Sequence, residues 1–404
     1  MNEAKQDAQA RRRSRIGFLN SHPIQYAAPL YAYLNSSQDI EPVALYLTDF
    51  SLRGAVDKQF GRAVKWDIDL LQGYESHFIG ETYRTDRPDS FFALKGHGIG
   101  KALGRLELDA LVVHGHNYLA SLRAMASAKI LGIPVMYKGE THLLLPRSKA
   151  KKALRGPIMR ALYSQIDCFL AISQRNREYY EAFGIGDDRI APFPYTVDNE
   201  RFISASSVSG EERRKIRQEL GLSESLPVVV YASKFMRRKH PDDVVTAAGK
   251  LHDAGIQCQV LLIGTGEMED ELREQARAAS PLPVVFAGFR NQSELPAILG
   301  ACDVFVLPSE NEPFGLIVNE AMCAGLPVVV SEEVGCVPDL VLNAITGRTF
   351  EAGNADSLAA ALRPLIEQED LRARMGAASR QRISEWGFEQ NLRGLREALR
   401  KIAR

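Results

Sequence analysis

The feature that most constrains the fold is a series of short apolar runs separated by segments of helix length. The runs are rich in Val, Ile and Leu and do not alternate with polar residues, as is typical of parallel strands buried on both faces. They occupy residues 15–20, 42–48, 110–115, 134–140 and 168–173 in the first half, and 227–233, 259–264, 283–289, 304–309 and 327–333 in the second. Because amphipathic helical patterns such as 240–255 and 316–325 lie between them, the sequence predicts parallel sheets with right-handed crossovers.

The length of 404 residues suggests two or three domains of ordinary size. A polar region joins the two series of strands, and we place the hinge near Thr196–Arg201. The predicted domains are 1–197 and 198–383, and a final helix in 384–404 is expected to pack back toward the first domain. The predicted fold class is α/β, with two Rossmann-like, doubly wound parallel sheets. Two such sheets facing each other leave a cleft at the carboxyl ends of their strands, where ligands of open α/β folds bind.

Composition excludes several classes of protein. Lys+Arg and Asp+Glu number 50 each, and this balance argues against nucleic acid as the main partner. None of the five cysteines forms a CxxC pair, which favours buried, reduced thiols and a reducing cytosol. The apolar run after the basic N-terminus is too short for a signal peptide, and no stretch approaches the ~18–20 apolar residues that span a bilayer. We therefore expect a cytoplasmic protein.

Two carboxylates bracket the stretch EPFGLIVNE at 312–320. A strand is predicted before it and a helix from about Phe314 or Gly315, which places Glu312 on a loop at the carboxyl end of the strand and Glu320 inside the helix. The N-terminus of such a helix suits a phosphate, and the glycine lets the backbone approach a ligand closely. An ordinary solvated helix with two acids is the alternative interpretation of this stretch alone.

A second cluster of charge follows the strand at 227–233. It consists of Lys234, Arg237, Arg238, Lys239 and His240. Cations at the carboxyl end of a buried strand can form an anion site, in which each charge-assisted bond to a phosphate contributes roughly 1.5–3 kcal/mol. The alternative is a solvated basic surface.

Together these two clusters resemble the nucleotide-sugar domain of glycosyltransferase family 4, whose members have the two-domain GT-B fold. EPFGLIVNE is similar to the E-x7-E signature of that family, and SKFMRRK resembles its phosphate loop, with Lys234 and Lys239 at the two cationic positions. Ser233 and His240 stand where the family has glycines, which is a departure. Further segments that follow the order of the family are YTVDNERF (195–202), GTGE (264–267), VVFAGF (284–289) and DVFVLPSENEPFG (303–315).

The resemblance implies a role for each matching residue. Glu320 would bind the ribose hydroxyls of the nucleotide, and Glu312 would lie beside the donor sugar and stabilise charge at its anomeric carbon. Lys234 and Lys239 would hold the diphosphate. The backbone N–H groups implied for sugar hydroxyls and phosphate are those of Phe314, Gly315 and Leu316.

Other candidate positions lie on loops that follow predicted strands. Arg290, in AGFRNQ (287–292), would stack on the nucleobase, although a solvated arginine is an alternative. His114 and His116 are predicted on opposite sides of one extended strand end. The family has a histidine near here that contacts the donor sugar, and His116 matches it best; a structural histidine is the alternative.

The first half departs from the family in one loop. SHPIQY has no glycine where relatives have a glycine-rich loop, and His22 and Gln25 are candidates to replace its contacts. YKGETH stands where relatives often show a second histidine, and from it Glu140 or His142 is expected to face the acceptor.

The resemblance implies a retaining, metal-independent hexosyltransferase that uses a UDP- or GDP-sugar and acts on a lipid-linked or oligosaccharide acceptor in polysaccharide biosynthesis. No DxD triad lies in a convincing position, and no cofactor is implied. The alternatives are another GT-B enzyme, a phosphorylase or an epimerase, and a non-catalytic sugar-nucleotide-binding module. A dinucleotide dehydrogenase is not supported, because GTGE lacks the GxGxxG pattern.

Residues 146–160 form a strongly basic segment. Its cations are Arg147, Lys149, Lys151, Lys152, Arg155 and Arg160, and no acid lies between Glu140 and Asp167. Such a segment can lie on anionic lipid, where each cation near the surface contributes about 1 kcal/mol. We therefore hypothesise peripheral association with the inner face of the plasma membrane; a solvated helix face or an interdomain contact is the alternative.

Overall fold

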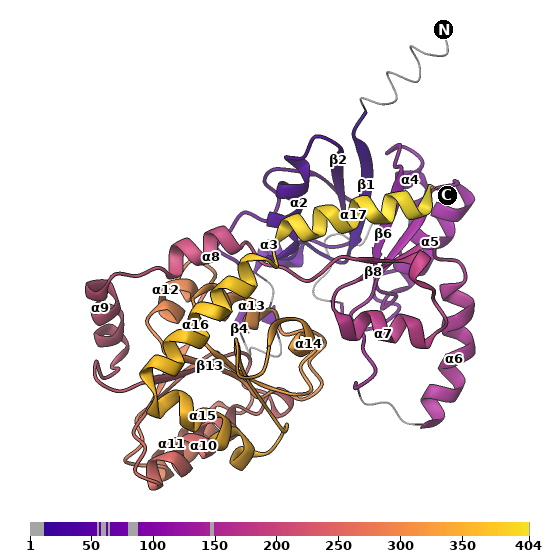
Figure 1. Ribbon diagram of the computed structural model, residues 1–404. Helices are drawn as coiled ribbons and strands as arrows, with labels where there is room; N and C mark the ends of the chain where they lie inside the picture. The colour runs from indigo at the N-terminus through magenta and orange to yellow at the C-terminus, as the bar shows by residue number, and fades with distance from the viewer. Residues whose placement is uncertain are drawn as a thin grey trace.

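The computed structural model describes residues 12–54, 56–57, 62–63, 65–79, 88–145 and 149–403, with the side chains of 56–57, 62–63 and 149–155 left out of the description. Within these residues the chain forms two large parallel sheets (Figure 1). The N-terminal sheet has the order β5 (Glu75–Phe78), β2 (Ile40–Tyr46), β1 (Ser14–Asn20), β6 (Ala110–His114), β7 (Val135–Lys138), β8 (Cys168–Ala171), β9 (Ile190–Pro192). The C-terminal sheet has the order β12 (Val284–Gly288), β11 (Gln259–Ile263), β10 (Val228–Ala232), β13 (Val304–Leu307), β14 (Val328–Ser331), β15 (Gly347–Phe350). A short antiparallel pair joins β3 (Val56–Asp57) and β4 (Arg62–Ala63).

Helices cover both faces of each sheet. Those of the N-terminal half are α2 (Ala27–Asn35), α3 (Phe50–Arg53), α4 (Ile99–Leu103), α5 (Leu119–Ile130), α6 (Lys149–Tyr163), α7 (Gln174–Ala182) and the 3-10 turn η1 (Asp187–Arg189). Those that follow are α8 (Asn199–Ser206), α9 (Gly210–Leu220), the 3-10 turn η2 (Arg237–Lys239), α10 (Pro241–Asp253), α11 (Glu269–Ala278), α12 (Leu295–Gly300), α13 (Leu316–Cys323), α14 (Val337–Leu340), α15 (Ala355–Glu367), α16 (Glu369–Ser384) and α17 (Phe388–Ile402). No helix among the described residues is long and apolar enough to span a membrane.

Alternate residues of the same strand enter different cores, which explains why the strands are apolar throughout. In β13, Val304 and Val306 pack beneath α10 and α15, whereas Phe305 and Leu307 pack beneath α12 and α13. All four side chains are fully buried. The prediction of parallel α/β sheets from the non-alternating runs is confirmed.

Three edge strands carry no comparable signal and were not predicted. β5 has the sequence ESHF and is only partly buried, and β9 has three residues. β15 has the sequence GRTF, with one apolar side chain at its end. An edge strand is paired on one side only and need not be apolar on both faces, so its sequence resembles that of a loop.

The last helix of the chain lies on the N-terminal half (Figure 1). Leu392, Leu395 and Ala398 of α17 join the core that α2 shares with β1 and β2. Asn391 accepts a hydrogen bond from Thr196 Oγ1 (2.7 Å) and donates one to the carbonyl of Pro194 (2.7 Å). The C-terminal segment thus crosses back beside the connection between the two sheets. The domain limits at 197 and 383 stay a prediction.

Candidate functional site

A cavity of about 270 Å³, here called the small cavity, lies at the carboxyl ends of the C-terminal strands. The predicted site residues that line it are Lys234, Lys239, Arg290, Glu312, Gly315, Leu316 and Glu320. From the N-terminal half, Gln25, Tyr26 and Trp66 also line it. Residues that are far apart in the sequence therefore meet around one space between the two halves.

Lys239 and Glu312 form an ion pair inside the small cavity. The lysine ends η2 and the glutamate lies on the loop after β13; the two side chains are 10% and 14% exposed. Burial, and then the charges of Arg238 and Lys234, lower the pKa of Lys239. The Glu312 carboxylate acts in the opposite direction, because it favours the charged ammonium.

The loop that carries Lys239 keeps a glycine-like backbone although its residues are not glycines. His240 has φ 46° and ψ 47°, the left-handed conformation that glycine adopts most easily. Pro241 follows as the first residue of α10. The substitution by His240 therefore leaves the turn between η2 and α10 in place, at the cost of about 1–3 kcal/mol of local strain.

Gly315 fixes the start of α13 at the edge of the same cavity. Its φ is 94°, and an added Cβ would lie 2.8 Å from Val334 Cγ1. The helix itself begins at Leu316, so its N-terminus faces the small cavity as expected. The Phe314 side chain does not line the cavity: it is buried, with its ring 5.5 Å from the Tyr195 ring.

Glu320 is a buried carboxylate at the end of a chain of polar contacts. Gln292 Nε2 donates to Glu320 Oε1 (3.4 Å), and Arg201 donates to the Gln292 side-chain oxygen (2.9 Å) and to its carbonyl (3.0 Å). Burial raises the pKa of Glu320 to about 7, against the effects of Gln292 and Arg201. Gln292 was quoted in a predicted loop but not singled out, and Arg201 was not predicted to belong to the site.

Arg290 lies on the loop after β12. Its Nε donates to the Ala287 carbonyl (3.1 Å), and it pairs with Glu294 (2.9 Å) on the following turn. Both contacts are local, and Arg290 also belongs to the wall of the small cavity. Stacking of Arg290 on a base stays a prediction.

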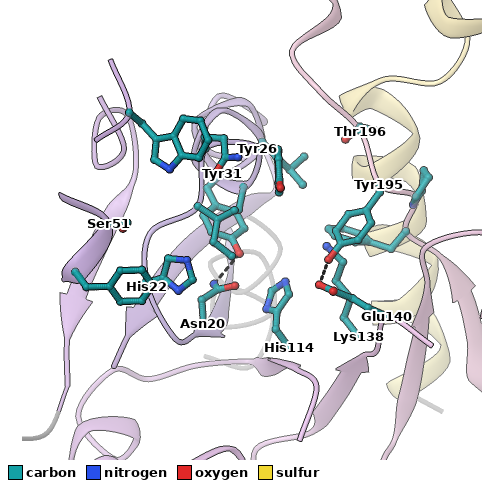
Figure 2. Close-up of a pocket in the computed structure, with 18 of the residues that line it drawn as sticks. Asn20, His22, Tyr26, Tyr31, Ser51, His114, Lys138, Glu140, Tyr195 and Thr196 are labelled. Carbon is teal, nitrogen blue, oxygen red and sulfur yellow. Dashed lines mark hydrogen bonds between the residues drawn. The ribbon is translucent and has the colours of Figure 1, made fainter. Parts of the chain in front are cut away.

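A second cavity of about 490 Å³, the large cavity, adjoins the small one on the N-terminal side. Figure 2 shows Asn20, His22, His114, Lys138 and Glu140 around it. The wall is completed by aromatic residues and by the connection between the halves, with Tyr26, Tyr31, Phe193, Tyr195 and Thr196. The two cavities share Gln25, Tyr26, Trp66 and Lys234.

His114, and not His116, belongs to the wall of the large cavity. The two residues do not lie on one extended strand as predicted, because β6 ends at His114 and Gly115 turns the chain with φ 69°. His116 lies on the loop, where its Nδ1 is 2.6 Å from the Tyr137 hydroxyl, and it lines neither cavity. A role for His116 at a donor sugar therefore has no support from its position.

The other candidates of the first half lie in different places. His22, Gln25 and Glu140 line the large cavity, and the Tyr195 hydroxyl donates to the Glu140 carboxylate. His142 is buried and reaches across to the C-terminal half, where its Nε2 donates to the Glu312 carbonyl (3.1 Å). Of the pair Glu140 and His142, only Glu140 lines a cavity.

Further contacts join the two halves beside the small cavity. Asn291 Nδ2 donates to the Lys65 carbonyl (2.8 Å), Ser293 donates to Asp67, and the Trp66 and Phe289 ring centroids are 6.2 Å apart. Residues 65–67 carry no pattern that could have predicted this. In the described part of the chain, no group of three or more His, Cys, Asp or Glu side chains is placed to hold a metal ion.

Two parallel α/β units with a cavity between the ends of their strands define the GT-B class of folds. Solved structures agree: over 96% of this chain and 99% of that one, the fold matches Anabaena Alr3699/HepE, solved in complex with UDP and glucose, with a TM-score of 0.69 at 18% identity. Residues 212–382 match the family of glycosyl transferases group 1, and residues 82–196 match the glycosyl transferase 4-like domain. The chain therefore belongs to the glycosyltransferase family that these two models describe, the group 1 family with a 4-like N-terminal domain.

Two curated relatives illustrate the range of the family. The GDP-mannose-dependent monoacylated alpha-(1-6)-phosphatidylinositol monomannoside mannosyltransferase of Corynebacterium glutamicum is 30% identical over 57% of this chain. The glycogen synthase of Mycobacterium tuberculosis is 29% identical over 68% of this chain. The alignments span 61% and 64% of the relatives' own lengths, so the likeness covers part of each enzyme.

Proposed function

We propose that the chain is a retaining hexosyltransferase that moves a sugar from a UDP- or GDP-linked donor to a lipid-linked or oligosaccharide acceptor. The observation that carries this proposal is the small cavity, where Lys234, Lys239, Glu312 and Glu320 line one space at the N-terminus of α13. Each part of a nucleoside diphosphate sugar has a suitable group in this cavity. The two lysines suit the diphosphate, the buried Glu320 carboxylate suits the ribose hydroxyls, and the Glu312 carboxylate suits the sugar.

Donor binding would exchange the partner of Lys239. In the structure this ammonium pairs with Glu312, and a diphosphate in the cavity would take the place of the carboxylate. Glu312 would then be free to accept hydrogen bonds from sugar hydroxyls or to stabilise positive charge at the anomeric carbon. Because one anionic partner replaces another, a group that favours the charged ammonium faces Lys239 both before and after donor binding.

The transfer itself breaks the bond between the anomeric carbon and a diphosphate oxygen, and the electron pair stays with the diphosphate. The acceptor hydroxyl oxygen forms the new bond to the anomeric carbon, and its proton passes to the leaving phosphate. Preorganised cations and the helix N-terminus stabilise the charge as it develops. Retention by attack on the same face as the leaving group follows from the family resemblance.

Both substrates remain to be identified. The Corynebacterium relative is named as GDP-mannose-dependent with a phosphatidylinositol monomannoside acceptor, and HepE was solved with UDP and glucose. The Corynebacterium relative supports a lipid-linked glycan as one acceptor class. Together the two proteins leave guanine and uracil as candidate bases of the donor.

A thermal-shift panel of UDP, GDP, ADP, CMP and common UDP- and GDP-sugars, with EDTA present, tests the donor site. We expect selective stabilisation by one nucleoside diphosphate, about 2.7 kcal/mol at 100 times its dissociation constant. The stabilisation should be smaller in Lys239→Ala and Glu320→Ala and unchanged in Arg237→Ala. If no nucleotide stabilises the protein, the donor site is wrong and a phosphorylase becomes the better interpretation. Nucleotide binding without any sugar transfer would point instead to a binding module.

We further propose that the protein works in the cytoplasm on the inner face of the plasma membrane. Arg147 and the side chains of Lys149, Lys151, Lys152 and Arg155 lie outside the described residues. Near this segment, Leu143, Leu144 and Ile158 are 52%, 53% and 62% exposed, and Arg160 is exposed on α6. Exposed apolar side chains beside a basic segment are typical of surfaces that enter the lipid headgroup layer.

Co-sedimentation with anionic liposomes tests this location. Neutralising all six cations of 146–160 should abolish binding, because the attraction of a basic segment to anionic lipid is electrostatic. Neutral liposomes serve as the control. Binding that persists after the six changes would contradict the proposal.

A further inference from the structure

Lys138 is a buried cation in the wall of the large cavity (Figure 2). It is the last residue of β7, and only 5% of its surface is exposed. Among the described residues, its ammonium has neither a carboxylate within ion-pair distance nor a hydrogen-bond acceptor. It lies instead 4.2 Å from the ring centroid of Tyr195 and 5.2 Å from that of Phe193. Ring faces stabilise a cation only in part.

The other buried cations of the described chain are paired. Arg217 is 3% exposed and contacts Asp303 at 2.6 Å, and Lys239 pairs with Glu312. A buried charge without a partner raises the free energy of the folded protein, so it is rare unless a ligand supplies the partner. Lys138 is the exception, and its position in a cavity wall indicates where that partner would come from.

The neighbouring groups do not neutralise Lys138. The Glu140 carboxylate accepts a hydrogen bond from Tyr195, and it is too distant for an ion pair with Lys138. Burial lowers the pKa of Lys138 to about 8, more than Glu140 raises it. At neutral pH the ammonium therefore stays largely charged.

His114 beside it is held neutral. Burial, and then the charge of Lys138, lower the pKa of His114 to about 3. Because the Leu19 carbonyl can only accept, the Nδ1–H of His114 donates to it (3.2 Å), which leaves Nε2 as an acceptor. Asn20 Oδ1 is likewise buried without a partner among the described residues. The wall thus combines one cation with hydrogen-bond acceptors suited to hydroxyls.

We infer that Lys138 binds an anionic group, a carboxylate or a phosphate, carried by the acceptor in the large cavity. This inference rests on the proposed transferase function and narrows its acceptor to a negatively charged one. A volume of about 490 Å³ is that of an ordinary small-molecule site. His114 and Asn20 accept hydrogen bonds from hydroxyls of the same molecule.

The acceptor, rather than the donor, is the source of the anion because of how the cavities are arranged. Lys138 lines only the large cavity, whereas Lys239 and Glu320 line only the small one. Lys234 belongs to both walls. A molecule anchored at Lys138 therefore meets a donor at their shared wall, where transfer would occur.

Calorimetric titration of the full chain with glycerol 3-phosphate, glucuronate and neutral glycerol tests the inference. The nucleoside diphosphate found by thermal shift is kept saturating so that Lys234 and Lys239 are occupied, and ionic strength is held constant. We expect one of the two anions to bind and glycerol not to bind. In Lys138→Met the affinity should fall at least about tenfold. Lys101→Gln, an exposed lysine on α4, should leave it unchanged.

Two results would overturn the inference: no binding of either anion to the wild-type protein, or equal binding to Lys138→Met. A third arm compares UDP-glucuronic acid with UDP-glucose. If Lys138→Met weakens only the uronic acid donor, the anion belongs to the donor and the acceptor assignment is wrong. Unfolding does not confuse the result, because removing an unpaired buried charge should not lower the melting temperature.

The same variants separate this inference from the proposed function. Lys138→Met should keep nucleotide binding while it loses the anion. Glu320→Gln should weaken nucleotide binding while it keeps the anion. If nucleotides bind and anions do not, only the inference fails. If no nucleotide binds, the anion titration is run in a Lys239→Met background instead. Anion binding through Lys138 in that variant would mean that the transferase proposal fails and the anion site stands.

Discussion

The two buried lysines of the cleft are held in different ways. Lys239, in the small cavity, has a carboxylate partner from the next loop, whereas Lys138, in the large cavity, has only aromatic rings beside it. An ion pair that is already formed can be exchanged for a contact with a phosphate at little net cost. An unpaired cation raises the free energy of the empty protein, and a matching anion relieves it. The comparison predicts that the two lysines respond oppositely to removal.

The largest expected effect is on turnover in Lys239→Met. If Lys239 stabilises the departing diphosphate, its loss should lower kcat about 10²–10³-fold, as the removal of one preorganised group typically does. Steady-state transfer from the donor identified by thermal shift measures this. The donor affinity should change less than kcat, because the charge on the leaving group is greatest in the transition state.

Arg237→Gln is the matched control for that experiment. Arg237 lies in the same basic run, but its side chain is 71% exposed and pairs with Glu271. Its loss should leave kcat within about twofold, since surface pairs contribute little. Equal losses of kcat in both variants would mean that the run acts only through its total charge.

The second effect concerns stability without ligands. Lys138→Met should raise the free energy of unfolding by about 3 kcal/mol at pH 7, because the folded-state pKa lies near 8, below the usual 10.5. In that case the unfolded chain binds more protons between these values, so the wild-type protein gains stability as pH rises from 8 toward 10.5. The advantage of methionine should therefore fade over the same range. Urea unfolding at several pH values measures it.

Lys239→Met should act in the opposite direction. It leaves Glu312 without its partner in a largely buried site, which costs roughly 1–3 kcal/mol. If both lysine variants gained stability, the ion pair of Lys239 would be no better than the ring contacts of Lys138, and the difference between the cavities would disappear.

The two cavities also differ in how far the sequence could predict them. Lys234 and Lys239 share one loop, and Glu312 and Glu320 share one strand-to-helix connection. Local patterns therefore marked two clusters, and the family resemblance joined them into one predicted site. The contacts that support Glu320 arise from Gln292 and Arg201, which are distant in sequence and meet only in the fold. Contacts between residues so far apart in the sequence produce no sequence pattern from which they could be predicted.

The large cavity had almost no local signal. Asn20, His114 and Lys138 come from the ends of three neighbouring strands, and Trp66 comes from a segment without pattern. The prediction that His114 and His116 lie on one extended strand was wrong, because the strand ends at His114 and Gly115 turns the chain. Central strands were predictable since both faces are buried, but which strand ends share a wall depends on sheet order, which the sequence did not provide.

A smaller effect is expected for Glu320→Gln. Loss of the carboxylate that accepts ribose hydrogen bonds should weaken nucleotide binding about tenfold. Since the pKa of Glu320 in the empty protein is raised to about 7, wild-type affinity should fall as pH drops below 7, where the acid binds a proton. The affinity of the glutamine variant should not vary with pH in this way. Calorimetry at pH 6 to 8 checks both points, with Glu271→Gln, an exposed acid, as the control.

The smallest effect uses the buried thiols as reporters of each half. The five cysteines are buried, and burial raises the pKa of Cys168 to about 11 and that of Cys323 further. Alkylation therefore requires local opening. Cys323 lies on α13 with Glu320, whereas Cys168 lies in β8 of the N-terminal sheet. A nucleotide present at its dissociation constant should slow labelling of Cys323 about twofold and leave Cys168 unchanged. Mass spectrometry gives both rates in one sample. Equal slowing at both sites would mean that the halves open together, and that the small cavity is not an independent unit of the cleft.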